Sequence, residues 1–116
     1  QTFYGALDER TYAHLLDARL DAVGYDLVTA PEETLHNVTE YGAARDAALG
    51  VIDGQNTAVE PAETIRQRVE WFRSHTPGVD VETTYATPNT ELFYLPVETF
   101  KRKLDALGTA LAEVTA

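Results

Sequence analysis

The sequence contains no cysteine, which excludes disulfides and thiolate sites for metals or nucleophilic catalysis within its 116 residues. It also lacks methionine and begins with Gln1, so we expect the chain to be a piece of a longer protein. Its apolar runs are all shorter than the roughly 18 residues of a membrane helix, and nothing resembles a cleaved signal. These absences predict a soluble, cytoplasmic protein that has no membrane partner.

Basic residues are scarce, with nine Lys and Arg against 19 Asp and Glu and a formal charge of -10. A surface this acidic repels phosphate backbones, so we expect no nucleic-acid partner. Only Lys101 and Lys103 are lysines. Abundant carboxylates with so little lysine predict a halophilic protein, because concentrated counterions screen the repulsion between carboxylates.

Short apolar segments that look like strands alternate with amphipathic helical segments along the chain. The strands are expected at residues 2–6, 25–29, 48–53 and 81–86. This alternation predicts an α/β protein with a parallel sheet. Four strand-helix units fit either a small open sheet or half of a TIM (β/α)₈ barrel, which needs roughly 250 residues in total. The absence of a start residue favours the half-barrel, a parallel (βα)4 unit that forms a single domain over residues 1–116.

The helices are expected from caps and apolar spacing. The first helix should follow Asp8 and end at Gly24, and its apolar face is predicted to contain Tyr12, Leu15, Leu16, Leu20 and Val23. The second should begin at Pro31, and the third near Pro61. After Pro96, apolar residues recur at spacings of three and four and predict a long helix with an inward face of Phe100, Leu104, Leu107, Leu111 and Val114.

Polar loops follow the last two predicted strands. Ligands of parallel α/β sheets bind outside the carboxyl ends of the strands, so these loops are the place to seek a site. The substrate-binding candidates are Asp53, Gln55, Asn56, Asn89, Thr90 and Glu91. An alternative interpretation is that Asp53 and Asn56 only stabilise a tight turn, and that Asn89 does the same after Pro88. The pattern assigns no catalytic residue.

Two other groups of residues suggest no site. The three histidines, His14, His36 and His75, lack partners at metal-ligand spacing, so we predict no metal in this chain. Residues 101–103 form the only basic cluster. A solvated helix face is favoured there over a site for phosphate or polyglutamate.

Several segments resemble the cobalamin-independent methionine synthase family, and they occur in the family's order. They are residues 1–5 (QTFYG), 25–28 (YDLV), 49–57 (LGVIDGQNT), 87–97 (TPNTELFYLPV) and 103–104 (KL). The resemblance implies that the chain is the C-terminal half of a (β/α)₈ barrel and contains its strands five to eight.

The catalytic barrel of that family holds a zinc ion that activates homocysteine for methyl transfer from a methyl-folate. The family's ligand positions correspond here to Thr2, Tyr4, Ala30 and Thr90, which supply neither thiolate nor imidazole. Gln55 stands where the family has a proton-donating histidine, and glutamine is no general acid. The segments are closer to the family's zinc-free N-terminal barrel. The resemblance therefore implies no cofactor in this fragment, with zinc confined to the related catalytic barrel.

The resemblance implies a part of a methionine synthase-like methyltransferase of methionine biosynthesis, which completes a cleft for folate or homocysteine and is inactive alone. The alternative is a non-catalytic binding or scaffold subunit that partners a separate zinc-bearing barrel. A barrel enzyme with another substrate is a third interpretation, because a fold does not fix a function. A half-barrel has open strand edges, so we also expect self-association, or pairing with the missing N-terminal half-barrel or a second barrel.

Overall fold

The computed structural model describes residues 5–115, and side chains up to residue 113. Within this part of the chain, helices and strands alternate in the following order: α1 (Glu9–Asp17), β1 (Ala22–Asp26), α2 (Pro31–Tyr41), β2 (Asp46–Ile52), α3 (Ala62–His75), β3 (Thr83–Pro88) and α4 (Val97–Thr115). The three strands form a parallel sheet in the order β1-β2-β3, which confirms the predicted α/β class. The strand predicted at residues 2–6 falls mostly outside the described residues.

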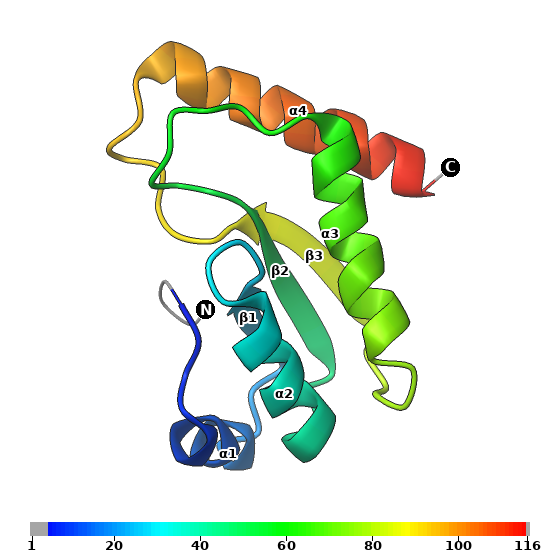
Figure 1. The fold of residues 1–116 in the computed structure, drawn as a ribbon. Helices are drawn as coiled ribbons and strands as arrows, with labels where there is room; N and C mark the ends of the chain where they lie inside the picture. Colours follow the sequence, from blue (N-terminus) through cyan, green and yellow to red (C-terminus); the bar gives the residue numbers. More distant parts are fainter. Residues whose placement is uncertain (1–4, 116) are drawn as a thin grey trace.

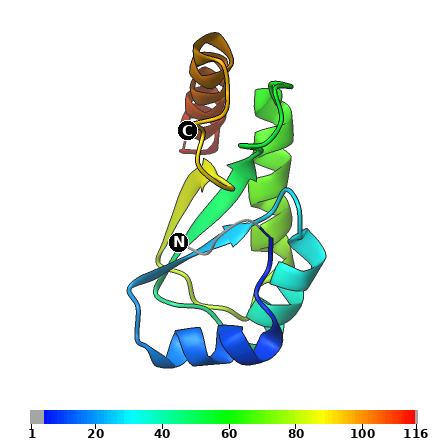
Figure 2. The same ribbon diagram turned by 90° about the vertical axis from the view of Figure 1, so that its left-hand side faces the viewer.

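One face of the sheet is covered by α2 and α3, as Figures 1 and 2 show. The core lies between them: the Tyr25 ring of β1 is 5.8 Å from the Phe72 ring of α3, and Leu49 of β2 is fully buried. The central strand β2 is almost entirely buried, which explains its nearly continuous apolar sequence.

The opposite face of the sheet carries small residues. Neighbouring strand residues point to opposite faces, so the row Gly24, Ala48 and Tyr85 points away from α3, whereas Tyr25 points toward it. Tyr85 is the large member of this row, and it is exposed.

The start of β1 differs from the prediction. We expected a helix through Val23 to Gly24, but α1 ends at Asp17 and both residues lie in β1. Arg19, with φ 56°, reverses the chain, and Leu20 is 44% exposed. Val23 is β-branched and pairs opposite Ala47 in the buried sheet, which stabilises the protein more than an extension of the surface helix would.

The end of β1 also differs, because residues 27–29 form a turn instead of completing a strand. Asp26 is the cause: its Oδ1 accepts hydrogen bonds from the N–H groups of Val28 and Thr29, both at 2.9 Å. A side chain that binds the backbone two and three residues ahead folds the chain into a turn.

The inward face of α4 is shifted by one residue from the predicted one. Lys103 and Ala110 are buried together with Leu107, whereas Phe100 and Leu104 are exposed. The predicted Val114 falls outside the described side chains. The shift follows from Lys103, whose ammonium group donates hydrogen bonds to the loop between β2 and α3 and so turns that side of the helix inward.

Helix α4 lies beyond the carboxyl ends of the strands, at the opposite end of the molecule from α1 (Figures 1 and 2). It packs mainly against α3 rather than along β3. Arg66 of α3 and Glu113 of α4 form an ion pair at 2.8 Å near the crossing. No helix within residues 5–115 is both long and apolar enough to cross a membrane.

Candidate functional site

The carboxyl ends of the three strands meet at one edge of the sheet, and the loops that follow them form what we call the rim: residues 27–30, 53–60 and 89–96. Parallel pairing places these loops side by side. The predicted candidates Asp53 and Asn89 therefore lie at the same edge, as expected. The hydrogen bonds below show how closely the loops are joined.

Asn89 joins all three loops of the rim. It is 1% exposed, and its Oδ1 accepts a hydrogen bond at 2.8 Å from the N–H of Gly54, in the loop after β2. Its Nδ2 donates to Asp26 Oδ2 and to Thr29 Oγ1 in the loop after β1, both at 3.4 Å. A buried amide with all these partners holds the rim together, and both its oxygen and its nitrogen are engaged within the protein.

Asp26 is a buried carboxylate at the end of β1 that we did not predict as a site residue. Besides the two turn N–H groups that bind Oδ1, the N–H of Gly5 donates to its Oδ2 at 2.8 Å. Backbone N–H donors offset much of the cost of burying a carboxylate. The strand was expected to extend to residue 29, which placed Asp26 within the strand rather than at its end, so local spacing did not indicate a site residue there.

Asp53 and Asn56 make the local hydrogen bonds that the turn interpretation expects. Asp53 Oδ1 accepts from the N–H of Gln55, and Asn56 Oδ1 accepts from the N–H of Ala58, both at 2.8 Å. Gln55 and Asn56 are exposed at the edge of the rim, whereas Asp53 is half-buried. A role for Asp53, Gln55 and Asn56 in binding a ligand stays a prediction.

The loops after β2 and β3 are in direct contact at Gly54. A Cβ on Gly54 would lie 2.8 Å from Thr90 Cγ2 and 2.8 Å from the backbone oxygen of Glu91, so only glycine fits there. Thr90 Oγ1 donates a hydrogen bond to Glu91 Oε2 at 2.7 Å, and this bond lowers the pKa of Glu91 below its ordinary value. Glu91 is therefore a carboxylate near neutral pH, placed beside the β2 loop.

A second polar network joins the rim to α3 and α4. Lys103 is 0% exposed, and its ammonium donates to Ala58 O at 2.7 Å and to Glu60 Oε1 at 2.6 Å. Glu60 Oε2 accepts from the N–H of Asp53 at 2.6 Å and from Arg68 at 3.3 Å. The prediction that residues 101–103 form a solvated helix face is therefore wrong for Lys103. Sequence spacing gave no sign of this pair, because it joins residues 43 positions apart.

Burial alone would raise the pKa of Glu60. Hydrogen bonds from Lys103 and from the N–H of Asp53 outweigh it, and the pKa lies below its ordinary value of 4.5. The charged pair is thus maintained near neutral pH. The hydrogen bonds of Lys103 and Glu60 hold the loop after β2 against α4.

The described residues do not fit a transition-metal site. Within residues 5–115, no three His, Cys, Asp or Glu side chains gather closely enough to hold an ion. Of the positions that correspond to the family's zinc ligands, Ala30 has no donor atom in its side chain, and the hydroxyl of Thr90 is hydrogen-bonded to Glu91. Thr2 and Tyr4 lie outside the described residues. The rim therefore offers polar binding groups without the ligands zinc prefers.

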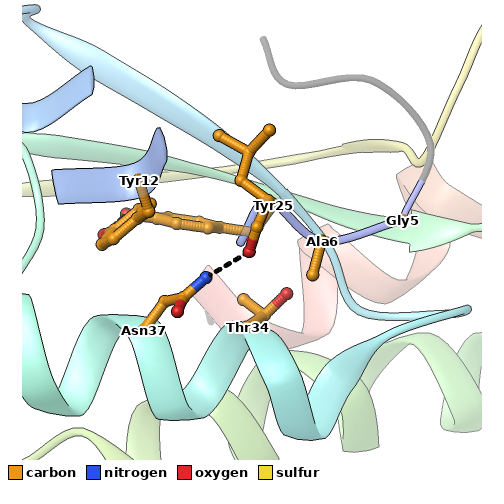
Figure 3. A pocket seen from close by; sticks show the side chains of 7 residues that line it. Gly5, Ala6, Tyr12, Tyr25, Thr34 and Asn37 are labelled. Carbon is orange, nitrogen blue, oxygen red and sulfur yellow. Dashed lines mark hydrogen bonds between the residues drawn. The ribbon is translucent and has the colours of Figure 1, made fainter. Parts of the chain in front are cut away.

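A small cavity of about 10 Å³ lies between residues 5–7, α1, β1 and α2 (Figure 3). Tyr12, Tyr25 and Asn37 point into this region. The two tyrosine hydroxyls are 2.8 Å apart, and Asn37 donates to Leu7 O, also at 2.8 Å, along the dashed line of Figure 3. Burial raises the pKa of Tyr25 far above its ordinary value. The cavity is too small for an organic substrate, so these groups serve the packing of α1 and α2 on β1.

Among solved structures, the chain is similar to a B12-independent methionine synthase from Shewanella sp. W3-18-1 in complex with selenomethionine, with a TM-score of 0.74 and 20% identity. The match covers 92% of this chain and 30% of that protein, so the chain spans less than a third of its length. At this identity the likeness shows the fold and supports the family at that coarse level. No family model matches the chain, and no curated protein matches it.

Proposed function

We propose that this chain is one half of a zinc-free barrel in a cobalamin-independent methionine synthase-like protein, where its rim forms part of a cleft for a folate or homocysteine-type substrate. The observation that carries the proposal is the fold likeness, which extends over 92% of the chain. The segments of residues 49–57 and 87–97, which carry the sequence resemblance, contain the two loops that Asn89 joins. The other half of the barrel would be the missing N-terminal half, and zinc would belong to a separate catalytic barrel.

In this proposal the rim residues have two roles. Asn89 and Asp26 fix the loops from within, because their polar atoms are bound to other protein groups. Gln55 and Asn56 at the outer edge and Glu91 at the β3 side would contact the substrate, with Asp53 and Thr90 orienting those side chains. The side-chain amides could donate hydrogen bonds to the carboxylate of homocysteine or the pterin of a folate. The chain would bind and position substrate, and methyl transfer would need the zinc-bearing barrel.

A second candidate is the scaffold subunit, and a specific observation favours it. Asp53, Asn56 and Asn89 make hydrogen bonds within the protein, which leaves fewer groups for a ligand. At the same time Phe93 and Tyr94, in the β3–α4 loop of the rim, are almost fully exposed. Exposed aromatic side chains are typical of protein interfaces. In this role the β3–α4 loop would contact a catalytic partner.

Calorimetric titration with 5-methyltetrahydrofolate and with homocysteine, in concentrated salt, separates the two candidates. The first candidate predicts saturable binding of one of them, weakened at least tenfold by Gln55→Ala and by Glu91→Gln. Gln67→Ala on α3 is the matched control and should leave affinity unchanged. No methyl transfer is expected from the chain alone with added zinc. Absence of binding to either compound would contradict the substrate role and favour the scaffold.

A further inference from the structure

The first half of α4 carries an exposed apolar stripe, which we define as Val97, Phe100 and Leu104. Their spacing of three and four places them on one side of the helix. Val97 is 65% exposed and Leu104 is 41% exposed. The loop before the helix adds Phe93, at 89% exposure, and Tyr94. Figure 1 shows why: the orange first half of α4 extends past α3, so α3 covers only the second half.

A groove with both apolar and polar walls lies on the same molecule, between the second half of α3 and β3. We call it the β3 groove. Its volume is about 580 Å³. Arg73, Thr76, Glu82 and Thr84 contribute its polar groups, and its apolar part is formed by Val69, Phe72, Val79, Val81, Ala86 and Leu111. In parallel α/β folds this side of a strand is normally covered by a helix. Because α4 packs mainly on α3, the groove stays open.

We propose that a second copy of this chain fills the β3 groove with its apolar stripe, and that the two copies form a two-fold symmetric dimer. The position of Leu111 indicates that the groove can accommodate apolar side chains from the same side of α4 as the stripe. It follows Leu104 by seven residues, so it lies on the same side of the helix, and it already forms one wall of the groove. In a two-fold symmetric dimer, the stripe of each copy binds in the β3 groove of the other copy. Both binding surfaces are then occupied, so the assembly stops at two copies.

Charge also favours a second copy over another partner. The chain carries -10 overall, yet the exposed Lys101 stands beside the stripe and is one of only two lysines. The β3 groove is lined by Glu82 and Arg73, and the exposed Asp80 lies two residues before Glu82 in the chain. Glu82 pairs with Arg45 at 3.8 Å and Arg73 pairs with Glu70 at 3.6 Å, so the three carboxylates outnumber the two guanidinium groups there. Insertion of the stripe into the groove would bring Lys101 of one copy close to Glu82 of the other copy. Such complementarity fixes the orientation of an interface.

The available area is sufficient for a stable pair. Aromatic side chains bury about 150–250 Å² each, so the stripe with Phe93 and Tyr94 offers on the order of 500 Å² of exposed surface. Two stripes and two grooves together exceed the roughly 1,200 Å² at which specific interfaces begin. An exposed apolar patch of this size is uncommon on a protein that functions as a monomer.

Sedimentation equilibrium of the full chain in concentrated salt tests the proposal. The wild type should have the mass of a dimer, and Leu104→Glu should raise the dissociation constant at least 100-fold. Leu20→Glu is the matched control, because Leu20 is equally exposed, at 44%, but lies far from α4 in sequence. Circular dichroism verifies that each variant is folded. A monomeric wild type, or a dimer that Leu104→Glu leaves intact, would overturn the proposal.

A charge exchange tests the orientation. Lys101→Glu and Glu82→Lys should each weaken the dimer about tenfold, and the double variant should regain most of the lost affinity. Tyr85→Glu, on the opposite face of the sheet, should leave the dimer unchanged. If Tyr85→Glu abolishes the dimer while the two charge variants do not weaken it, the copies meet through the sheet face and the proposed interface is wrong. Because no substrate enters these measurements, their outcome is independent of the methionine synthase-like role.

Discussion

The side-chain oxygen of Asn89, just after β3, accepts a hydrogen bond from the N–H of Gly54, just after β2, at 2.8 Å. The side-chain nitrogen of the same residue reaches Asp26 at the end of β1. One buried amide thus binds residues that lie 35 and 63 positions before it in the sequence. Asn89 therefore links all three loops of the rim, and four predictions about stability follow from the contacts around it and around α4.

Asn89→Ala should destabilise the protein by about 2–3 kcal/mol, because it leaves the buried N–H of Gly54 without its acceptor and removes a donor to Asp26. Asn56→Ala is the matched control. It removes a hydrogen bond to Ala58 at an exposed position and should cost less than about 1 kcal/mol. Urea unfolding followed by Trp71 fluorescence measures both. Equal effects of the two substitutions would show that Asn89 does not hold the rim.

Gly50→Ala should destabilise the protein by about 1–3 kcal/mol or more, since the added methyl group overfills a packed site. Its Cβ would lie 2.7 Å from Tyr25 O and 2.8 Å from Asn89 Cα, both backbone atoms that cannot swing away. Gly108→Ala in α4 is the control. Its Cβ would meet nothing within 4 Å, and alanine should stabilise the helix by about 0.5–1 kcal/mol. Opposite signs in thermal unfolding are the expected result.

Lys103→Met should cost about 3–5 kcal/mol, because it leaves the largely buried carboxylate of Glu60 without its ammonium partner. Lys101→Met is the matched control, since the ion pair of Lys101 with Glu98 at 3.9 Å is exposed and should contribute under about 0.5 kcal/mol. Comparable losses for the two lysines in urea unfolding would contradict a structural role for the buried pair.

The same pair predicts a dependence of stability on pH. The folded pKa of Glu60 lies below its ordinary value of 4.5, so its stabilising contribution is present above pH 4.5 and is lost as the pH falls through the folded pKa. In Lys103→Met the pKa of Glu60 rises, because a hydrogen bond that lowers it is removed. The acid-induced loss of stability should therefore be shallower in the variant. An unchanged slope in urea unfolding below pH 5 would contradict this assignment.

His36 of α2 should titrate above its ordinary pKa of 6.5, because its Nε2 is hydrogen-bonded to Glu9 of α1. A raised folded pKa means that the contribution to stability is present below pH 6.5 and is lost as the pH rises through the folded value. NMR titration of the imidazole should show the pKa falling in Glu9→Gln. Glu63→Gln on α3 is the control and should not change it. A His36 pKa unaffected by Glu9→Gln would mean that the pair does not form.

The class of fold could be predicted from the sequence because β2 and α3 carry their signals locally. The apolar run before Asp53 marks a buried parallel strand, and only Ala48 in it is half-buried rather than buried. Ile65, Val69 and Phe72 mark one face of a helix, and all three are buried. The first helix was extended too far. The helical spacing of apolar residues continues as far as Val23. Val23 nevertheless lies in β1, because it pairs with Ala47 of β2.

The candidate rim could be located from the sequence, whereas its chemistry could not. Asp53 and Asn89 were expected at one edge because parallel strands end together, and Gly54 bonds Asn89 there. The burial of Asp26, Glu60 and Lys103 depends on partners far along the chain, which local spacing does not contain. The same limit explains the shifted face of α4, because one long-range ion pair outweighed its apolar periodicity.

The exchange rate of the Gly54 amide proton, measured by NMR, tests most directly whether the loops after β2 and β3 form a single rim. Gly54 lies in a loop, so strong protection is expected only if Asn89 accepts its hydrogen bond. We predict exchange at least 100-fold slower than that of the exposed Gln55, and loss of this difference in Asn89→Ala. Exchange of Gly54 as fast as that of Gln55 in the wild type would contradict the shared rim.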